Sequence, residues 1–352
     1  MSGTTDADNA LGALPEKTAD KVVAAMENKL GTTMEEAEAN LIRLAEEALA
    51  QHGQPLPGEE WYDDAGAEAR EQARASGLDE EVGIAVTAVL SPGTEWGENV
   101  AHAKLVMDAV KSKDTPLTAQ QIAEVNEWGS TPNNTTHKLN SSVQAEPGDT
   151  LATLYAKDAK LAGVMVAKDG NATAGYGYSS KFEKAVTLAM ENDRSLLADG
   201  KTQSGSYLLG GAKVRSFYNN LSEPRNTGGD VTVDVHMMRA ISSTVGKRDA
   251  NWAAVADSAT MSSMTSTPRH KGAAVGILPA AADSIRSATA KFNEAHGTSL
   301  LPHQFQAVTW VQQKATYPTT RVKNILSGGE VEVAAYTRDD GTKVEAYTKE
   351  AP

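Results

Sequence analysis

The 352-residue sequence predicts a mainly helical protein. Apolar residues recur at helical spacing in several segments, most regularly from Met34 to Ala48, where glutamates occupy the other positions. Start and stop signals bound these segments, including the capping-box pair Thr118 and Gln121 and the run Ser91-Pro92-Gly93. A clear strand pattern occurs only around Asp340-Gly341, which predicts a β-hairpin at the end of the chain.

The spacing of apolar residues and turn residues places the elements in chain order. Helices are predicted at Glu16–Leu30, Thr33–His52, 61–77, 78–90, 94–110, 118–125, 151–163, Lys181–Asn192, 212–221, Ala280–His296 and Pro302–Ala315. Between about Asn126 and Ser180 the periodicity is lost, so we expect long loops around one short helix there, and a second loop-rich section at Ser258–Gly276.

The composition excludes several classes of protein. The chain has no cysteine, so it has no disulfide, no thiol nucleophile and no cysteine-bound zinc or iron–sulfur cluster. No apolar run approaches the roughly 18 residues of a membrane span. The start "MSGTTDADNALGALPEK" lacks both the basic and the apolar part of a signal peptide. We therefore expect an intracellular protein with no membrane partner and no cofactor.

The excess of acidic over basic side chains is confined to residues 1–82. Residues 1–82 carry 19 acidic and 6 basic side chains, whereas 83–352 carry 27 of each, so the whole net charge of -13 arises before residue 83. The linker-like stretch "GQPLPGEE" follows the second helix. We expect an acidic helical extension at 1–58, more readily a solvated accessory hairpin than a site for a protein partner, ahead of a helical domain at 59–325 and a tail at 326–352.

Two stretches could carry chemistry. In "YLLGGAKVRSFYNNL", Gly210 and Gly211 precede a helix, whose free backbone N–H groups, with Lys213 and Arg215, could hold a phosphate. The same residues are equally consistent with an ordinary turn between two helices. In "VTVDVHMMRAI", Asp234 precedes a helix that begins near His236.

Asp234 reads either as an N-cap or as a functional carboxylate, and one role does not exclude the other. His236 has three interpretations: structural support, which we favour, a general acid or base, and a metal ligand. No other pattern indicates a metal site.

The order of these parts resembles the helix-hairpin-helix DNA glycosylase superfamily. Its "LSxQT", "LPGVGxK" and "VDTHVxR" segments correspond to Leu90–Thr94, to the turn before Lys213, and to Val233–Arg239. The turn here reads Leu208-Leu209-Gly210-Gly211 where the superfamily usually has Pro-Gly-x-Gly, and Pro92-Gly93 replaces the usual Gln.

The chain is also similar to an uncharacterised group of actinobacteriophage proteins. The shared segments are "ALSPxTxWxxN", "GxKVRSFYxNL", "VTVDxHxxRA" and "QAxxWV", between about Trp61 and Pro318. The resemblance implies a protein that a phage encodes, placed in the host cytoplasm or in the virion.

The resemblance implies a glycosylase-like helical domain that acts on the N-glycosidic bond, or on the base, of a flipped nucleotide. Asp234 would stabilise the cationic transition state, Lys213 would attack the sugar or bind phosphate, and His236 would support Asp234. The residues that would contact DNA are Gly210, Gly211, Arg215, Ser91, Thr94 and Arg239, and Trp96 and Tyr218 would stack on a base, although such aromatic residues are more often core.

Two alternatives remain open. The first is a transferase on the same scaffold that hypermodifies thymine in phage DNA. The second is a non-enzymatic protein, bound to the virion, to DNA or, through the acidic N-terminus, to another phage protein. The tail segment Tyr336–Tyr347 resembles short "YxRxDGTxVxxY" elements, which favour an anchoring module.

Overall fold

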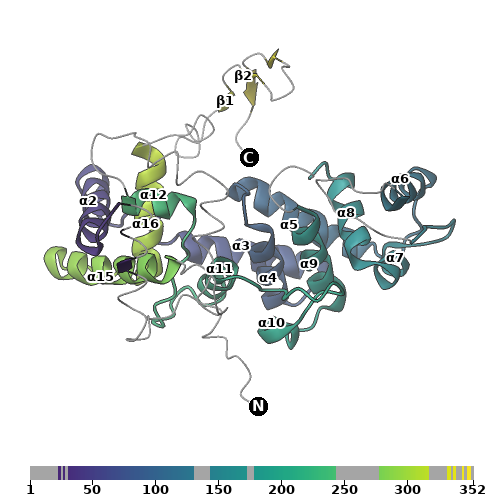
Figure 1. Cartoon of the computed structure of the whole chain (residues 1–352), viewed down its shortest axis with the longest axis horizontal. Coiled ribbons are helices and arrows are strands. Elements are labelled where there is room, and N and C mark those ends of the chain that lie inside the picture. Colours follow the sequence, from purple (N-terminus) through teal and green to yellow (C-terminus); the bar gives the residue numbers. More distant parts are fainter. Residues whose placement is uncertain are drawn as a thin grey trace. The chain divides into compact units, whose positions relative to one another are not determined.

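The computed structural model describes residues 31–130, 143–172, 178–242 and 277–316, together with short strands after 330 and a few positions near 25. The described part is mainly helical, as predicted (Figure 1). Its contacts divide it into a central unit, Tyr62–Asn226, and a flanking unit made of 31–61 and the residues from Thr227 onward. None of the described helices has the length and apolarity needed to cross a membrane.

The central unit is built around helices that are buried on all sides. Its helices are α3 (Trp61–Ser76, of which Trp61 belongs to the flanking unit), α4 (Glu80–Leu90), α5 (Trp96–Lys111), α6 (Ala119–Ser130), α7 (Leu151–Lys157), α8 (Ala159–Asp169), α9 (Tyr178–Glu191), α10 (Leu196–Asp199) and α11 (Ala212–Ser222). In α4, every residue from Val82 to Leu90 is buried. The most extensive packing in this unit joins α9 to α8 and to α4, so α9 is its central element.

The flanking unit packs one acidic helix against three others. Its helices are α2 (Met34–His52), α12 (Val235–Ser242), α15 (Leu278–His296) and α16 (Pro302–Thr316), and α2 contacts the other three. The predicted apolar stripe of α2 is buried, including Leu41 and Leu44. Glu38 forms an ion pair with Lys291, and Glu46 Oε1 lies within hydrogen-bond distance, 3.2 Å, of His296 Nε2. This helix is therefore part of a core, which corrects the expectation of a solvated accessory hairpin.

Local sequence signals set the helix ends as predicted. Thr33 and Glu36 form a capping box at the start of α2, and Thr118 and Gln121 exchange the same pair of hydrogen bonds before α6. The helix α3 ends before Gly77, whose φ of +73° favours glycine. Most of the helix predicted at Glu16–Leu30 lies outside the described residues.

The section between α6 and α9 contains more helix than predicted. Where the spacing predicted one short helix, Asp158 separates α7 from α8, and its side chain accepts a hydrogen bond from the backbone N–H of Leu161 at 2.9 Å. The whole of Leu161–Ala167 is buried, so α8 has no polar face. A helix that is buried on all sides shows no amphipathic period. For that reason the residues after Gly163 were predicted to form a loop, and this prediction is wrong as far as Asp169.

Two predictions concern residues that the structure describes only in part or leaves out. The loop-rich section Ser258–Gly276 lies outside the described residues. Near the C-terminus, Val331–Val333 (β1) pairs with Tyr347–Lys349 (β4), and Tyr336–Thr337 (β2) pairs with Lys343–Val344 (β3), both antiparallel. The turn at Asp340-Gly341 lies outside the described residues, so the hairpin stays a prediction.

The contact between α8 and α9 supplies a direct test of this packing. A Cβ atom added at Gly163 would lie 2.6 Å from the backbone nitrogen of Glu183 and 2.7 Å from the carbonyl carbon of Phe182. We expect Gly163→Ala to lower the free energy of unfolding by about 1–3 kcal/mol, because the two backbones must separate. Gly97→Ala, at an exposed position in α5, is the control and leaves stability unchanged or slightly raised. Urea unfolding of both variants checks this, and equal midpoints would contradict the close approach.

Candidate functional site

The two glycines of the predicted phosphate turn stand at the start of α11. Gly211 is the N-cap of this helix, with φ 95° and ψ 136°, and no side chain caps the helix start. A residue with a Cβ adopts this backbone only with strain, which explains the glycine. Since the first backbone N–H groups of a helix have no partner within it, the turn offers hydrogen-bond donors and a positive dipole end.

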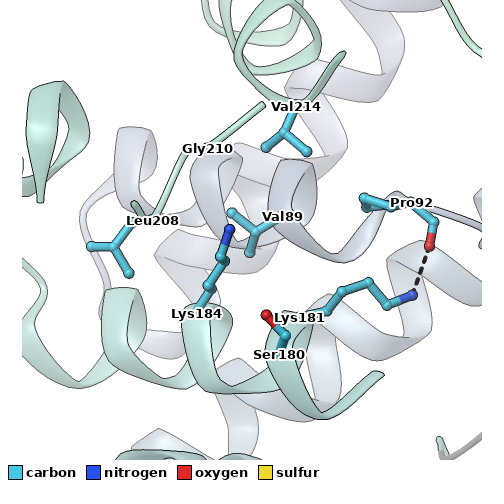
Figure 2. A pocket seen from close by; sticks show the side chains of 8 residues that line it. All are labelled: Val89, Pro92, Ser180, Lys181, Lys184, Leu208, Gly210 and Val214. Atoms are coloured by element: carbon cyan, nitrogen blue, oxygen red, sulfur yellow. Dashed lines mark hydrogen bonds between the residues drawn. The ribbon is translucent and has the colours of Figure 1, made fainter. Parts of the chain in front are cut away.

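A cavity of about 190 Å³ lies beside this turn in the central unit. Its apolar walls come from four side chains on α4, α11 and the connecting segments, namely Val89, Pro92, Leu208 and Val214. Its polar lining consists of Ser180, Lys181 and Lys184 on α9, and Gly210 completes it (Figure 2). Among the described residues that line the cavity none is acidic, so the cavity carries an excess of positive charge.

The Lys181 ammonium is buried at the end of α4. It donates hydrogen bonds to the carbonyl oxygens of Pro92, at 2.8 Å, and Leu90, at 3.3 Å, and to Thr94 Oγ1, at 2.8 Å. The side chain is only 6% exposed, and this burial lowers the pKa of Lys181 to about 8, helped by the positive charge of Lys213 and opposed by Glu98. The three N–H groups of this ammonium are thus engaged by protein oxygens.

Lys184, one turn further along α9, has different surroundings. Its side chain points toward Gly210 and Val89 (Figure 2), and a Cβ atom added at Gly210 would lie 3.5 Å from Lys184 Nζ. Burial lowers the pKa of Lys184, and the neighbouring Glu183 opposes that shift. Within the described ranges, Lys184 has no hydrogen-bond or ion-pair partner. Its ammonium is therefore available to a ligand.

The predicted DNA-contacting residues of the central unit have different positions. Thr94 Oγ1 accepts from Lys181 and donates to the carbonyl oxygen of Leu90 at 3.0 Å, so Thr94 helps to hold Lys181, which lines the cavity. Ser91 is 7% exposed, and its buried Oγ has no hydrogen-bond partner among the described residues. The proposed roles of both residues toward DNA stay predictions.

Arg215 is turned into the protein. It is 4% exposed, and its guanidinium donates to the carbonyl oxygens of Leu197, at 2.6 Å, and Ala198, at 2.8 Å. These bonds hold the short helix α10, which the sequence did not predict, against α11. The structure thus gives the charge of Arg215 a role in folding that needs no phosphate.

The two predicted stacking residues of the central unit also have partners within the protein. Trp96 lies edge-on to Phe217 with the ring centroids 6.4 Å apart. The Tyr218 hydroxyl donates to Glu81 Oε2 at 3.1 Å, and burial, together with the charge of Glu81, raises the pKa of Tyr218 to about 12. Both side chains are only half-buried, so the stacking role and the core role both stay predictions.

Asp234, in the flanking unit, caps α12. Its Oδ1 accepts from the backbone N–H of Met237 at 2.9 Å, and its Oδ2 accepts from Trp310 Nε1 at 3.2 Å. The residue is half-buried. Helix α12 and Trp310 therefore fix the carboxylate in one orientation, and the predicted N-cap is confirmed.

Trp310 also contacts His236, another functional candidate of the flanking unit. The His236 ring lies edge-on to the Trp310 ring, with the two centroids 6.0 Å apart. The Trp61 and Trp310 ring centroids are 6.2 Å apart, with an angle of 50° between the ring planes. Lys314 Nζ lies 4.2 Å from the Trp310 ring centroid. Burial lowers the pKa of Arg239, and the charge of Asp234 opposes that shift. The described residues contain no group of three or more histidine, aspartate or glutamate side chains suited to a metal ion.

The two lysines of the cavity were not predicted from the sequence. Lys181 and Lys184 stand three residues apart in "YSSKFEKAV", which places them on one face of α9. Charged residues on a helix usually face water, so nothing in the pattern distinguished this pair from solvated lysines. The missing signal was their position beside apolar residues of α4, which only the packing of α4 on α9 reveals.

Part of the chain is similar to a known protein family. A model described as a family of unknown function, DUF7178, matches residues 23–153. No curated protein and no solved structure matches the chain. The matched segment includes α2 of the flanking unit and α3–α6 of the central unit, together with the start of α7. Functional inference therefore depends on the residues themselves.

The position of Asp234 leads to a prediction about stability. Asp234→Ala removes the acceptor for the Met237 N–H and for Trp310, so we expect a loss of about 1–2 kcal/mol in the free energy of unfolding. Asp234→Asn keeps the acceptor for the Met237 N–H but turns an amide NH2 toward Trp310 Nε1–H, so we expect a smaller loss, of less than about 1 kcal/mol. Urea unfolding followed by tryptophan fluorescence separates the two variants. An equal loss in both would show that the cap does not stabilise α12.

Proposed function

We propose that the protein processes bases in DNA, with Asp234 as the key carboxylate of a glycosylase-like reaction on a flipped nucleotide. The observation that carries this proposal is the fixed, half-buried carboxylate of Asp234 at the start of α12, held by Met237 N–H and Trp310 Nε1. The order of the motifs around Leu90, Gly211 and Asp234, shared with the helix-hairpin-helix glycosylases, supports it.

The chemistry of such a site is simple to state. Cleavage of an N-glycosidic bond passes through a cation at the sugar, and a preoriented carboxylate stabilises that cation or directs the incoming nucleophile. A carboxylate that already accepts two hydrogen bonds from rigid donors needs little rearrangement during the reaction. His236 and Arg239 follow Asp234 on α12 and would support or balance its charge.

An abasic-site assay tests this proposal. Duplexes with normal, damaged and hydroxymethylated bases are incubated with the protein, treated with alkali and examined for strand breaks. We expect breaks with at least one base for the wild type, and a decrease of at least 100-fold for Asp234→Asn, which removes the negative charge while keeping the N-cap.

The same experiment distinguishes the alternatives. If the wild type yields no breaks with any base, base excision is contradicted. Mass analysis of the recovered nucleosides then tests the thymine-modifying transferase, which would leave an altered base that depends on Asp234. An unaltered base together with abundant copies of the protein in purified particles would support the non-enzymatic, virion-associated alternative.

A further inference from the structure

The central unit has a second candidate site that does not rest on the proposed reaction at Asp234. We propose that the cavity beside the Gly210–Gly211 turn binds a phosphate monoester, with the Lys184 ammonium as the principal hydrogen-bond donor to the phosphate.

The two lysines of the cavity would have different roles toward a bound anion. The N–H groups of Lys181 are engaged by Leu90, Pro92 and Thr94, so Lys181 contributes charge but no free donor. Lys184 has no hydrogen-bond or ion-pair partner in the described part of the chain, and its ammonium lies next to the backbone of Gly210. An anion in the cavity would satisfy Lys184 without disturbing the bonds of Lys181.

The charge balance favours a dianion over a single negative charge. Two ammonium groups line a cavity whose described lining holds no acidic side chain, and Lys213 adds a third positive charge close enough to affect Lys181. The carboxylates that act on these lysines, Glu98 and Glu183, are not part of the lining. A buried charge without a counter-charge is costly. A phosphate monoester carries about −1.5 to −2 at neutral pH and offers three strong acceptor oxygens, whereas a phosphodiester carries only about −1.

The size and walls of the cavity limit the ligand. About 190 Å³ holds roughly six water molecules at about 30 Å³ each, less than the roughly 300–1,000 Å³ of a typical pocket for a drug-sized ligand. A phosphate with a short organic group fits this space, and Val89, Leu208 and Val214 offer apolar contacts to the organic part. The uncapped start of α11, next to Gly210, adds the favourable end of a helix dipole.

Isothermal titration of the full-length protein with ribose 5-phosphate tests this site, with ribose as the neutral control. We expect saturable 1:1 binding of ribose 5-phosphate and none of ribose. Lys184→Met should weaken that binding at least 10-fold. Lys104→Met, which removes one positive charge from an exposed lysine of α5, should leave it unchanged. Absence of saturable binding to the wild type, equal binding of ribose, or equal affinity in both variants would overturn the proposal.

A second measurement does not depend on how the Lys184 variant folds. Wild-type protein is labelled with an amine-reactive reagent with and without ribose 5-phosphate, and the labelled lysines are identified by mass spectrometry. Protection of Lys184 but not of Lys104 supports the site, and equal labelling of Lys184 in both conditions contradicts it. A 5′-phosphorylated oligonucleotide that protects Lys184 more than its 5′-hydroxyl form would identify a nucleic-acid end, rather than a free sugar phosphate, as the source of the monoester.

Discussion

The buried ammonium of Lys181 is the interaction on which the arrangement of the central unit depends. Helix α4 is enclosed from Val82 to Leu90, so the carbonyl groups at its C-terminal end cannot rely on water for hydrogen bonds. Lys181 supplies the missing donors to Leu90 and Pro92 and binds Thr94 as well. A buried charge is tolerated only when it is hydrogen-bonded. The lysine therefore supplies donors to the carbonyl groups at the helix end, and these carbonyl groups supply acceptors to the lysine.

That single contact also shapes the cavity. It fixes the Pro92 wall against α9 and places Lys184, one turn later on α9, beside the turn that opens α11 (Figure 2). In the flanking unit a carboxylate holds a helix start, because Asp234 joins the start of α12 to Trp310 on α16. The described residues therefore include a positive group, Lys181, and a negative group, Asp234, that are each held by hydrogen bonds at a helix end.

Local patterns predicted much of the fold but little of the cavity. The capping residues Thr118 and Gln121 and the N-cap Asp234 act through neighbours within three residues, so the sequence alone reveals them. The part of helix α8 beyond Gly163 was missed because burial on all sides removes the periodic signal. Lys181 and Arg215 bind carbonyl groups that are 17 or more residues away in the chain, and no local pattern records such a partner.

The free energy of unfolding of Lys181→Met, measured beside Lys184→Met, tests this account most directly. Both changes remove one positive charge from neighbouring turns of α9, but only the first removes hydrogen bonds from the end of α4. We expect Lys181→Met to cost about 2 kcal/mol or more and Lys184→Met less than about 0.5 kcal/mol. Equal stability of the two variants, or a more stable Lys181→Met, would contradict the structural role of the buried ammonium.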